Sequence, residues 1–77
     1  MSEFRVTFPQ RFRNEPHPTL PQAHPDGWLT IEAPSLGLAR DIAFYRLGDE
    51  WAFIYPDDDM RDHLYPLGEI ARFKENE

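Results

Sequence analysis

Residues 27–55 carry the signals of a strand, a capped helix and a second strand in immediate succession. The helix is predicted over residues 36–47, because both of its ends are marked in the sequence. Pro34 disfavours helical geometry at the residue before it, and Ser35 then follows as the N-cap. Gly48 is the left-handed residue that commonly ends a helix. The unit predicts a fold in which helix and sheet pack together.

Both segments beside the predicted helix have the pattern of β-strands. Residues 28–33 alternate, with Leu29, Ile31 and Ala33 on one side and Trp28, Thr30 and Glu32 on the other. Residues 51–55 are apolar on both sides, with Ala52 and Ile54 facing one way and Trp51, Phe53 and Tyr55 the other. A strand that is apolar on both faces is expected inside a sheet, covered on both sides or at an interface.

Two further segments predict strands near the ends of the chain. Residues 2–8 alternate as a half-buried strand that ends at Pro9, with Phe4, Val6 and Phe8 on the inner side. Residues 69–73 form either a strand, with Ala71 and Phe73 on one face, or a helix.

The segments between these elements are long. Residues 9–25 contain five prolines and form a loop that is either functional or mobile, fastened by Phe12 and Leu20. Residues 56–68 form an acidic loop, and residues 74–77 a solvated tail. We therefore expect one small α+β domain over residues 1–77. Its architecture is a two-layer sandwich, with a three- to four-stranded sheet and one helix on one face.

Composition narrows the class of protein. The chain has 77 residues, no cysteine and a net charge of −6, so disulfides and thiolate metal sites are excluded. It has neither the ~18–20 consecutive apolar residues of a membrane span nor a signal peptide, so we expect a soluble intracellular protein with no membrane partner. An acidic body repels phosphate backbones, which disfavours direct binding to nucleic acid.

Candidate metal ligands gather in the proline-rich loop, which contains His17, His24 and Asp26. Two imidazoles and one carboxylate at this spacing match no established zinc pattern. The alternative is that they are solvated loop residues, one of them hydrogen-bonded to a carbonyl.

The acidic loop contains four aspartates, namely Asp57, Asp58, Asp59 and Asp62. The glycine and glutamate positions of a calcium-binding EF-hand are not matched, so we expect a solvated turn. Asp62 and His63 are an adjacent acid and imidazole, but neighbours in sequence rarely face each other as a catalytic triad requires. The sequence therefore predicts no catalytic residue, no cofactor and no metal.

The predicted helix has more apolar residues than one sheet-facing stripe can hold. Leu36, Ala39, Ala43 and Leu47 share the face toward the sheet. Leu38, Ile42 and Tyr45 form a flanking stripe, and Phe44 projects nearly opposite the centre of the whole apolar arc. A contiguous aromatic patch on a small protein commonly marks an interface. We predict that a partner, or a second copy in a homodimer, docks on this side, unless the proline-rich loop or the C-terminal segment covers it.

Most of the chain resembles small uncharacterised proteins encoded by actinobacteria and their bacteriophages. The matching features are His17-Pro18, His24-Pro25-Asp26-Gly27-Trp28, Ala39-Arg40, Leu47-Gly48, Trp51-Ala52-Phe53 and Gly68-Glu69. The resemblance implies a phage or prophage accessory protein made in a bacterial cytoplasm, and it assigns no activity to any residue.

These observations favour a non-enzymatic module that binds and modulates a bacterial host protein. The alternative is an acidic mimic of nucleic acid, in which residues 57–62 together with Asp49 and Glu50 occupy a basic groove.

Overall fold

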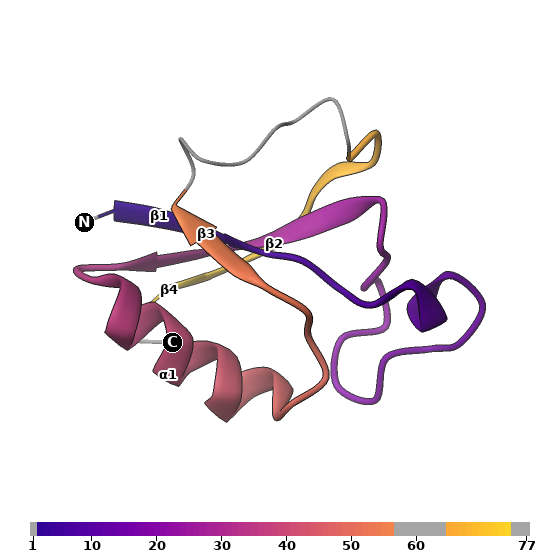
Figure 1. Ribbon diagram of the computed structural model, residues 1–77, viewed down its shortest axis with the longest axis horizontal. Coiled ribbons are helices and arrows are strands. Elements are labelled where there is room, and N and C mark those ends of the chain that lie inside the picture. Colours follow the sequence, from indigo (N-terminus) through magenta and orange to yellow (C-terminus); the bar gives the residue numbers. More distant parts are fainter. Residues whose placement is uncertain (1, 57–64, 75–77) are drawn as a thin grey trace.

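One α-helix lies across one face of a four-stranded β-sheet in the computed structural model, which describes residues 2–56 and 65–74 (Figure 1). The elements in chain order are β1 (Ser2–Val6), the 3-10 helix η1 (Gln10–Arg13), β2 (Gly27–Ala33), α1 (Leu36–Leu47), β3 (Ile54–Pro56) and β4 (Gly68–Lys74). This arrangement confirms the predicted two-layer α+β sandwich. It also decides between the alternatives at the C-terminal end, because residues 68–74 form a strand.

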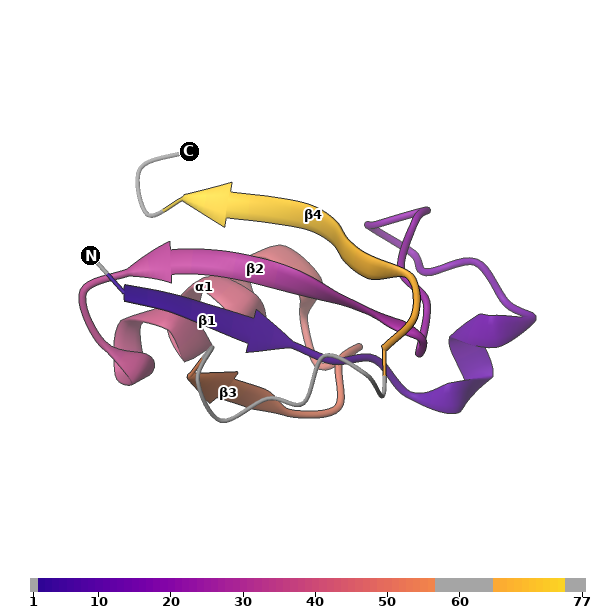
Figure 2. The same cartoon turned by 90° about the horizontal axis from the view of Figure 1, so that it is seen from above.

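The sheet has the strand order β3-β1-β2-β4 (Figure 2). Strand β1 is antiparallel to both of its neighbours, and β2 is parallel to β4. The two strands joined by α1 therefore run in the same direction, but β1 lies between them. The central pair, β1 and β2, is aligned from Ser2↔Ala33 to Val6↔Leu29.

The core lies between the sheet and α1. The predicted inner side of β2, formed by Leu29, Ile31 and Ala33, has no exposed surface. Strand β2 also comes very close to β4 at Gly27, where a Cβ atom would lie only 2.7 Å from Cγ2 of Ile70. A glycine at this position allows the two backbones to approach where the parallel pairing begins.

Both predicted ends of α1 are confirmed. The Ser35 hydroxyl accepts a hydrogen bond from the amide of Leu38 at 3.2 Å, and the Gly48 amide donates to the carbonyl of Phe44 at 2.9 Å. Gly48 has φ 65° and ψ −130°, a conformation in which a side chain would be strained. Ala39, Ala43 and Leu47 are buried as expected, but Leu36 in the first turn is 41% exposed.

Residues 51–55 do not form the predicted strand that is covered on both sides inside the sheet, and the alternative, that their apolar faces meet an interface, stays a prediction. Strand β3 covers only Ile54–Pro56 and lies at the edge of the sheet. Before it, the amide of Ala52 donates to the carbonyl of Thr7, whose own amide donates to the carbonyl of Phe53. Ala52 and Phe53 thus lie opposite the single residue Thr7, which is the geometry of a β-bulge. The segment is apolar on both sides because some of its side chains face α1 and others remain at the exposed edge.

The proline-rich loop packs against the core and closes one end of it. Phe12, which lies in η1, and Leu20 are each 5% exposed, so both fasten the loop as predicted. His17 is also buried, at 3% exposure. Residues 57–64, which include most of the predicted acidic loop, and residues 75–77 of the predicted tail lie outside the described part of the chain.

Candidate functional site

The four helix residues predicted to form an interface do not share one surface. Leu38 and Ile42 are half-buried and pack against the core. Tyr45 is 87% exposed, whereas Phe44 is 50% exposed and its ring meets the indole of Trp51 edge-on, with centroids 5.2 Å apart. Phe44 therefore does not project away from the apolar side of the helix as expected. It belongs to a contact between α1 and the segment that leads into β3.

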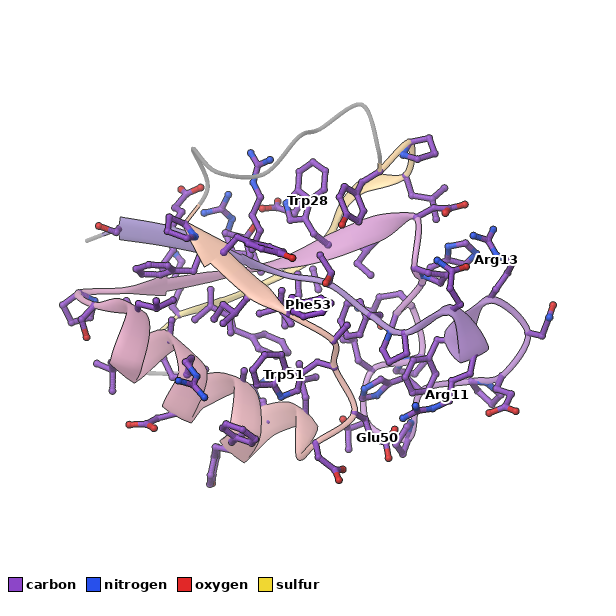
Figure 3. All side chains as sticks on the ribbon, in the orientation of Figure 1. Arg11, Arg13, Trp28, Glu50, Trp51 and Phe53 are labelled. Atoms are coloured by element: carbon purple, nitrogen blue, oxygen red, sulfur yellow. The ribbon has the colours of Figure 1, made fainter. Side chains whose placement is uncertain are left out.

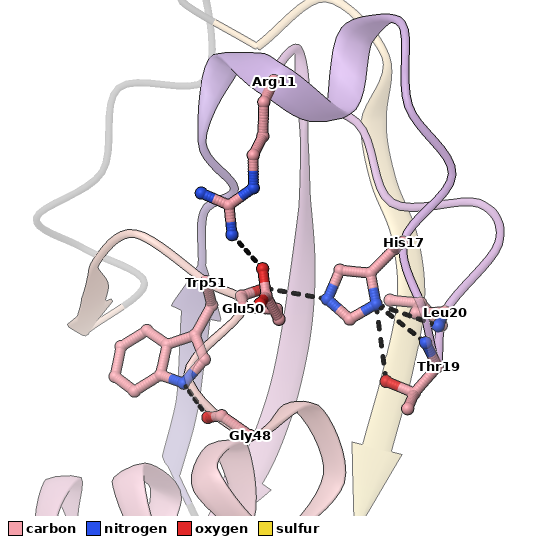
Figure 4. Close-up of polar contacts among 7 residues, drawn as sticks. All are labelled: Arg11, His17, Thr19, Leu20, Gly48, Glu50 and Trp51. Atoms are coloured by element: carbon pink, nitrogen blue, oxygen red, sulfur yellow. Dashed lines mark hydrogen bonds and ion pairs between the residues drawn. The ribbon is translucent and has the colours of Figure 1, made fainter.

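That contact is part of a larger exposed apolar surface, which we call the aromatic seam. It comprises Leu36, Phe44, Trp51 and Phe53. Figure 3 shows Trp51 lying between α1 and β3, with Phe53 above it on the strand side. The indole N–H of Trp51 donates to the carbonyl of Gly48 at 3.0 Å, which holds the ring in place after the turn (Figure 4). Phe53 is 62% exposed, so the seam is open to solvent.

A shallow hollow of about 340 Å³ lies along the aromatic seam. Its lining residues are Leu36, Arg40, Trp51, Ala52, Phe53 and Ile54. Arg40 is the charged residue among them, and the remaining walls are apolar. This combination of aromatic walls with one cationic side chain is suited to binding rather than to acid–base chemistry, because the lining contains no carboxylate and no imidazole.

Among the arginines in the described ranges, Arg40 alone has no hydrogen bond, ion pair or aromatic ring as its partner. Arg5 and Arg46 lie over the rings of Trp28 and Phe73, Arg11 and Arg13 pair with Glu50 and Asp26, and Arg72 binds Glu3, Glu32 and Glu69. The triple pairing of Arg72 joins β1, β2 and β4 on the face of the sheet opposite α1. Arg40 is therefore the described arginine that is available to an external carboxylate.

The structure separates the candidate metal ligands. Nε2 of His17 lies 2.8 Å from the carbonyl oxygen of Glu50, and its Nδ1 accepts hydrogen bonds from the amides of Thr19 and Leu20 (Figure 4). Since Nδ1 accepts from two N–H groups, the ring is neutral and Nε2 carries the proton that is donated to Glu50. Both ring nitrogens are thus engaged. The predicted bond between a histidine and a carbonyl is confirmed, but His17 is buried, not solvated as expected.

His24 and Asp26 are used locally in the turn before β2. Nδ1 of His24 accepts from the amide of Asp26 at 3.0 Å, and both carboxylate oxygens of Asp26 accept from the guanidinium of Arg13 at 2.9 Å. The Arg13 guanidinium lowers the pKa of the Asp26 carboxyl below its usual value. Within the described residues, no group of three or more histidine, aspartate and glutamate side chains is arranged to hold a metal ion.

The predicted acidic site is only partly described. Asp57, Asp58, Asp59, Asp62 and His63 lie outside the described residues. Of the two acids expected to join them, Glu50 is paired with Arg11, so its charge is partly neutralised.

A second hollow, of about 360 Å³, is lined by Thr7, Phe8, Pro9, Gln10, Pro25, Asp26, Ala52, Phe53 and Tyr65.

Sequence reasoning missed three of the residues that form the seam's hollow. The sequence places Trp51 and Phe53 in a strand that is covered on both sides or lies at an interface, and it does not single out Arg40. The available signal was the apolar run after the helix, which has more large side chains than a short edge strand can bury.

No protein-family model, curated protein or solved structure matches this chain. In the part of the chain that the structure describes, no helix has the length and apolar character needed to cross a bilayer.

Proposed function

We propose that this protein is a non-enzymatic binding module that docks on a bacterial host protein through the aromatic seam. The proposal keeps the predicted function and moves the centre of the docking surface. It now runs from Phe44 across Trp51 to Phe53. The resemblance to phage-type accessory proteins supports a bacterial cytoplasm as the place of action.

The observation that carries the proposal is the exposure of several large apolar side chains at one place. Phe44 and Phe53 are 50% and 62% exposed, and both lie beside the half-buried Trp51. Single exposed apolar residues are ordinary, but a contiguous patch of aromatic residues commonly marks a protein interface. Aromatic anchors at the centre of such a patch often contribute about 2 kcal/mol or more to binding.

The test compares capture of a partner by matched surface variants. We expect wild-type protein immobilised on a resin to retain a specific protein from bacterial lysate, and Phe53→Ser to lose it. Leu67→Ser is the control, because Leu67 is 54% exposed and precedes β4 rather than lining the seam. Binding of the purified partner is then measured by calorimetry, and urea titration checks that both variants are folded.

Equal binding by Phe53→Ser and the wild type would contradict the proposal. The salt dependence of binding distinguishes an apolar interface from the acidic mimic. Binding through an apolar interface should weaken little between 50 mM and 500 mM salt. Steep weakening would instead favour the acidic mimic, whose contacts are between charged groups screened by salt.

A further inference from the structure

We infer that the aromatic seam recognises an extended peptide segment of the partner in which an acidic side chain lies next to a bulky apolar one. The inference rests on the proposed function and specifies the chemistry of its partner. Three features of the described residues carry it: the unpaired Arg40, the size and lining of the hollow, and the backbone at the edge of β3.

Arg40 supplies the charge selectivity. The other described arginines are engaged by carboxylates or rings, and the guanidinium beside the hollow is available. A guanidinium beside apolar walls forms a stronger hydrogen bond with a carboxylate than it does in bulk water. The same charge repels a lysine or arginine at that position, so it discriminates as well as binds.

The hollow supplies the apolar selectivity. Its volume of about 340 Å³ lies near the lower end of the range for binding sites, which is enough for one or two bulky side chains and not for a large cofactor. Trp51 is held by its hydrogen bond to Gly48, so one wall is already fixed before a ligand binds. A preformed aromatic wall lowers the entropy lost on binding.

The edge of β3 favours an extended segment over a helix. Hydrogen-bonded and non-hydrogen-bonded pairs alternate along an antiparallel ladder. Because Thr7 exchanges hydrogen bonds with the bulge at Ala52 and Phe53, the next pair, Val6↔Ile54, is of the non-bonded kind. The amide and carbonyl of Ile54 therefore face away from β1, beside the hollow that Ile54 also lines. An incoming strand can pair with them and place alternate side chains toward Arg40.

Pairing along this edge is short. Strand β3 has three residues and ends at Pro56, which has no amide hydrogen to donate. The backbone contribution is thus confined to about one residue, so the side-chain contacts must determine which segment binds. A short segment of the partner is therefore sufficient to pair with this edge.

The experiment selects peptides from a surface-displayed library of random octapeptides. We expect wild-type protein to enrich sequences in which aspartate or glutamate adjoins a bulky apolar residue. Arg40→Glu should reverse the charge preference toward lysine and arginine. For a peptide selected by the wild type, Arg40→Ala should weaken binding by about tenfold or more, as expected when a hydrogen bond to a charged group is lost.

Lys74→Glu is the matched control. It makes the same change in net charge at an exposed residue of β4, on the opposite edge of the sheet from β3. The selected sequences and their affinities should stay within about twofold of wild type, since a remote exposed charge is screened by solvent.

The possible failures are distinguishable. The inference is overturned if the selected peptides contain no acidic residue, or if Arg40→Glu selects the same peptides as the wild type. In either case the proposed docking surface is still supported if Phe53→Ser abolishes binding. Failure to enrich any peptide also overturns it, and the lysate capture then decides the proposed function separately. The library includes octapeptides that span residues 57–64 and 70–77 of this chain. Selection of either one would show that the protein recognises a segment of its own chain, and this result would overturn the inference of a foreign partner.

Discussion

His17 links two parts of the chain through one imidazole, and two substitutions separate its contacts. Nε2 donates to the carbonyl of Glu50, after α1, while Nδ1 accepts from the amides of Thr19 and Leu20 in the loop. Asparagine places an acceptor near the position of Nδ1, so His17→Asn keeps the local turn and loses the link to Glu50. Glutamine places a donor near Nε2, so His17→Gln keeps the link and weakens the turn.

The magnitude follows from the burial of these groups. Each buried backbone group left without a partner costs about 1–3 kcal/mol, so His17→Asn should lower the free energy of unfolding by about 1–3 kcal/mol. His17→Ala leaves all three groups without partners and removes a ring that packs against Phe8 and Phe12, with centroids 5.7 Å and 4.8 Å away. At about 1 kcal/mol or more for each group, we expect it to cost about 3 kcal/mol or more, a large part of the stability of a domain this small.

The pH dependence has a definite sign. Burial lowers the pKa of His17 below the ordinary value of 6.5, and the guanidinium of Arg11 lowers it further. The unfolded chain therefore takes up a proton at a higher pH than the native protein. The contribution of His17 is fully present above pH 6.5 and is lost as the pH falls from 6.5 toward its folded pKa, by at most about 1.4 kcal/mol per pH unit.

The assay is urea unfolding followed by tryptophan fluorescence at pH 7.5, 6.5, 5.5 and 5.0. Wild type should lose stability over the lower half of this range, and His17→Asn should lose less because its side chain does not titrate. The reasoning is refuted if His17→Asn has the wild-type midpoint at pH 7.5, or if both proteins have the same dependence on pH.

Four further predictions also concern the stability of the fold. Ser35→Ala should cost about 0.5–2 kcal/mol through loss of the helix cap. Gly48→Val should lower the free energy of unfolding by more, because the backbone conformation of Gly48 is strained for a residue with a side chain. If Ser35→Ala and Gly48→Val both unfold at the wild-type urea midpoint, these helix ends are contradicted. Phe44→Ser should cost no more than about 1.5 kcal/mol, the value of an aromatic pair, while weakening partner binding; a cost of about 3–5 kcal/mol would show that the ring is a core residue. The protein should fold without metal, and a rise in melting temperature with Zn²⁺ or Ca²⁺ that chelator abolishes would contradict this.

Local signals in the sequence were sufficient to predict the helix, its two caps and the strand before it. A proline before an N-cap serine and a glycine after the last turn act within a few residues, so their effect does not depend on the rest of the fold. The alternation of residues 28–33 likewise predicted which side of β2 faces the core. The fold class follows from these elements, because one amphipathic helix and several short strands bury their apolar sides in few ways.

The functional surface depended on contacts between residues far apart in sequence. The sequence shows that residues 51–55 are apolar, but the bulge opposite Thr7 and the position of β3 at the edge of the sheet decide that Phe53 is exposed. Likewise, His17 finds its acceptor 33 residues away, at Glu50. No local pattern indicates that Arg40 lacks a partner while the other described arginines have one. Tertiary packing decides which apolar and charged side chains remain available, because each is removed from solvent only by a neighbour that the fold brings to it.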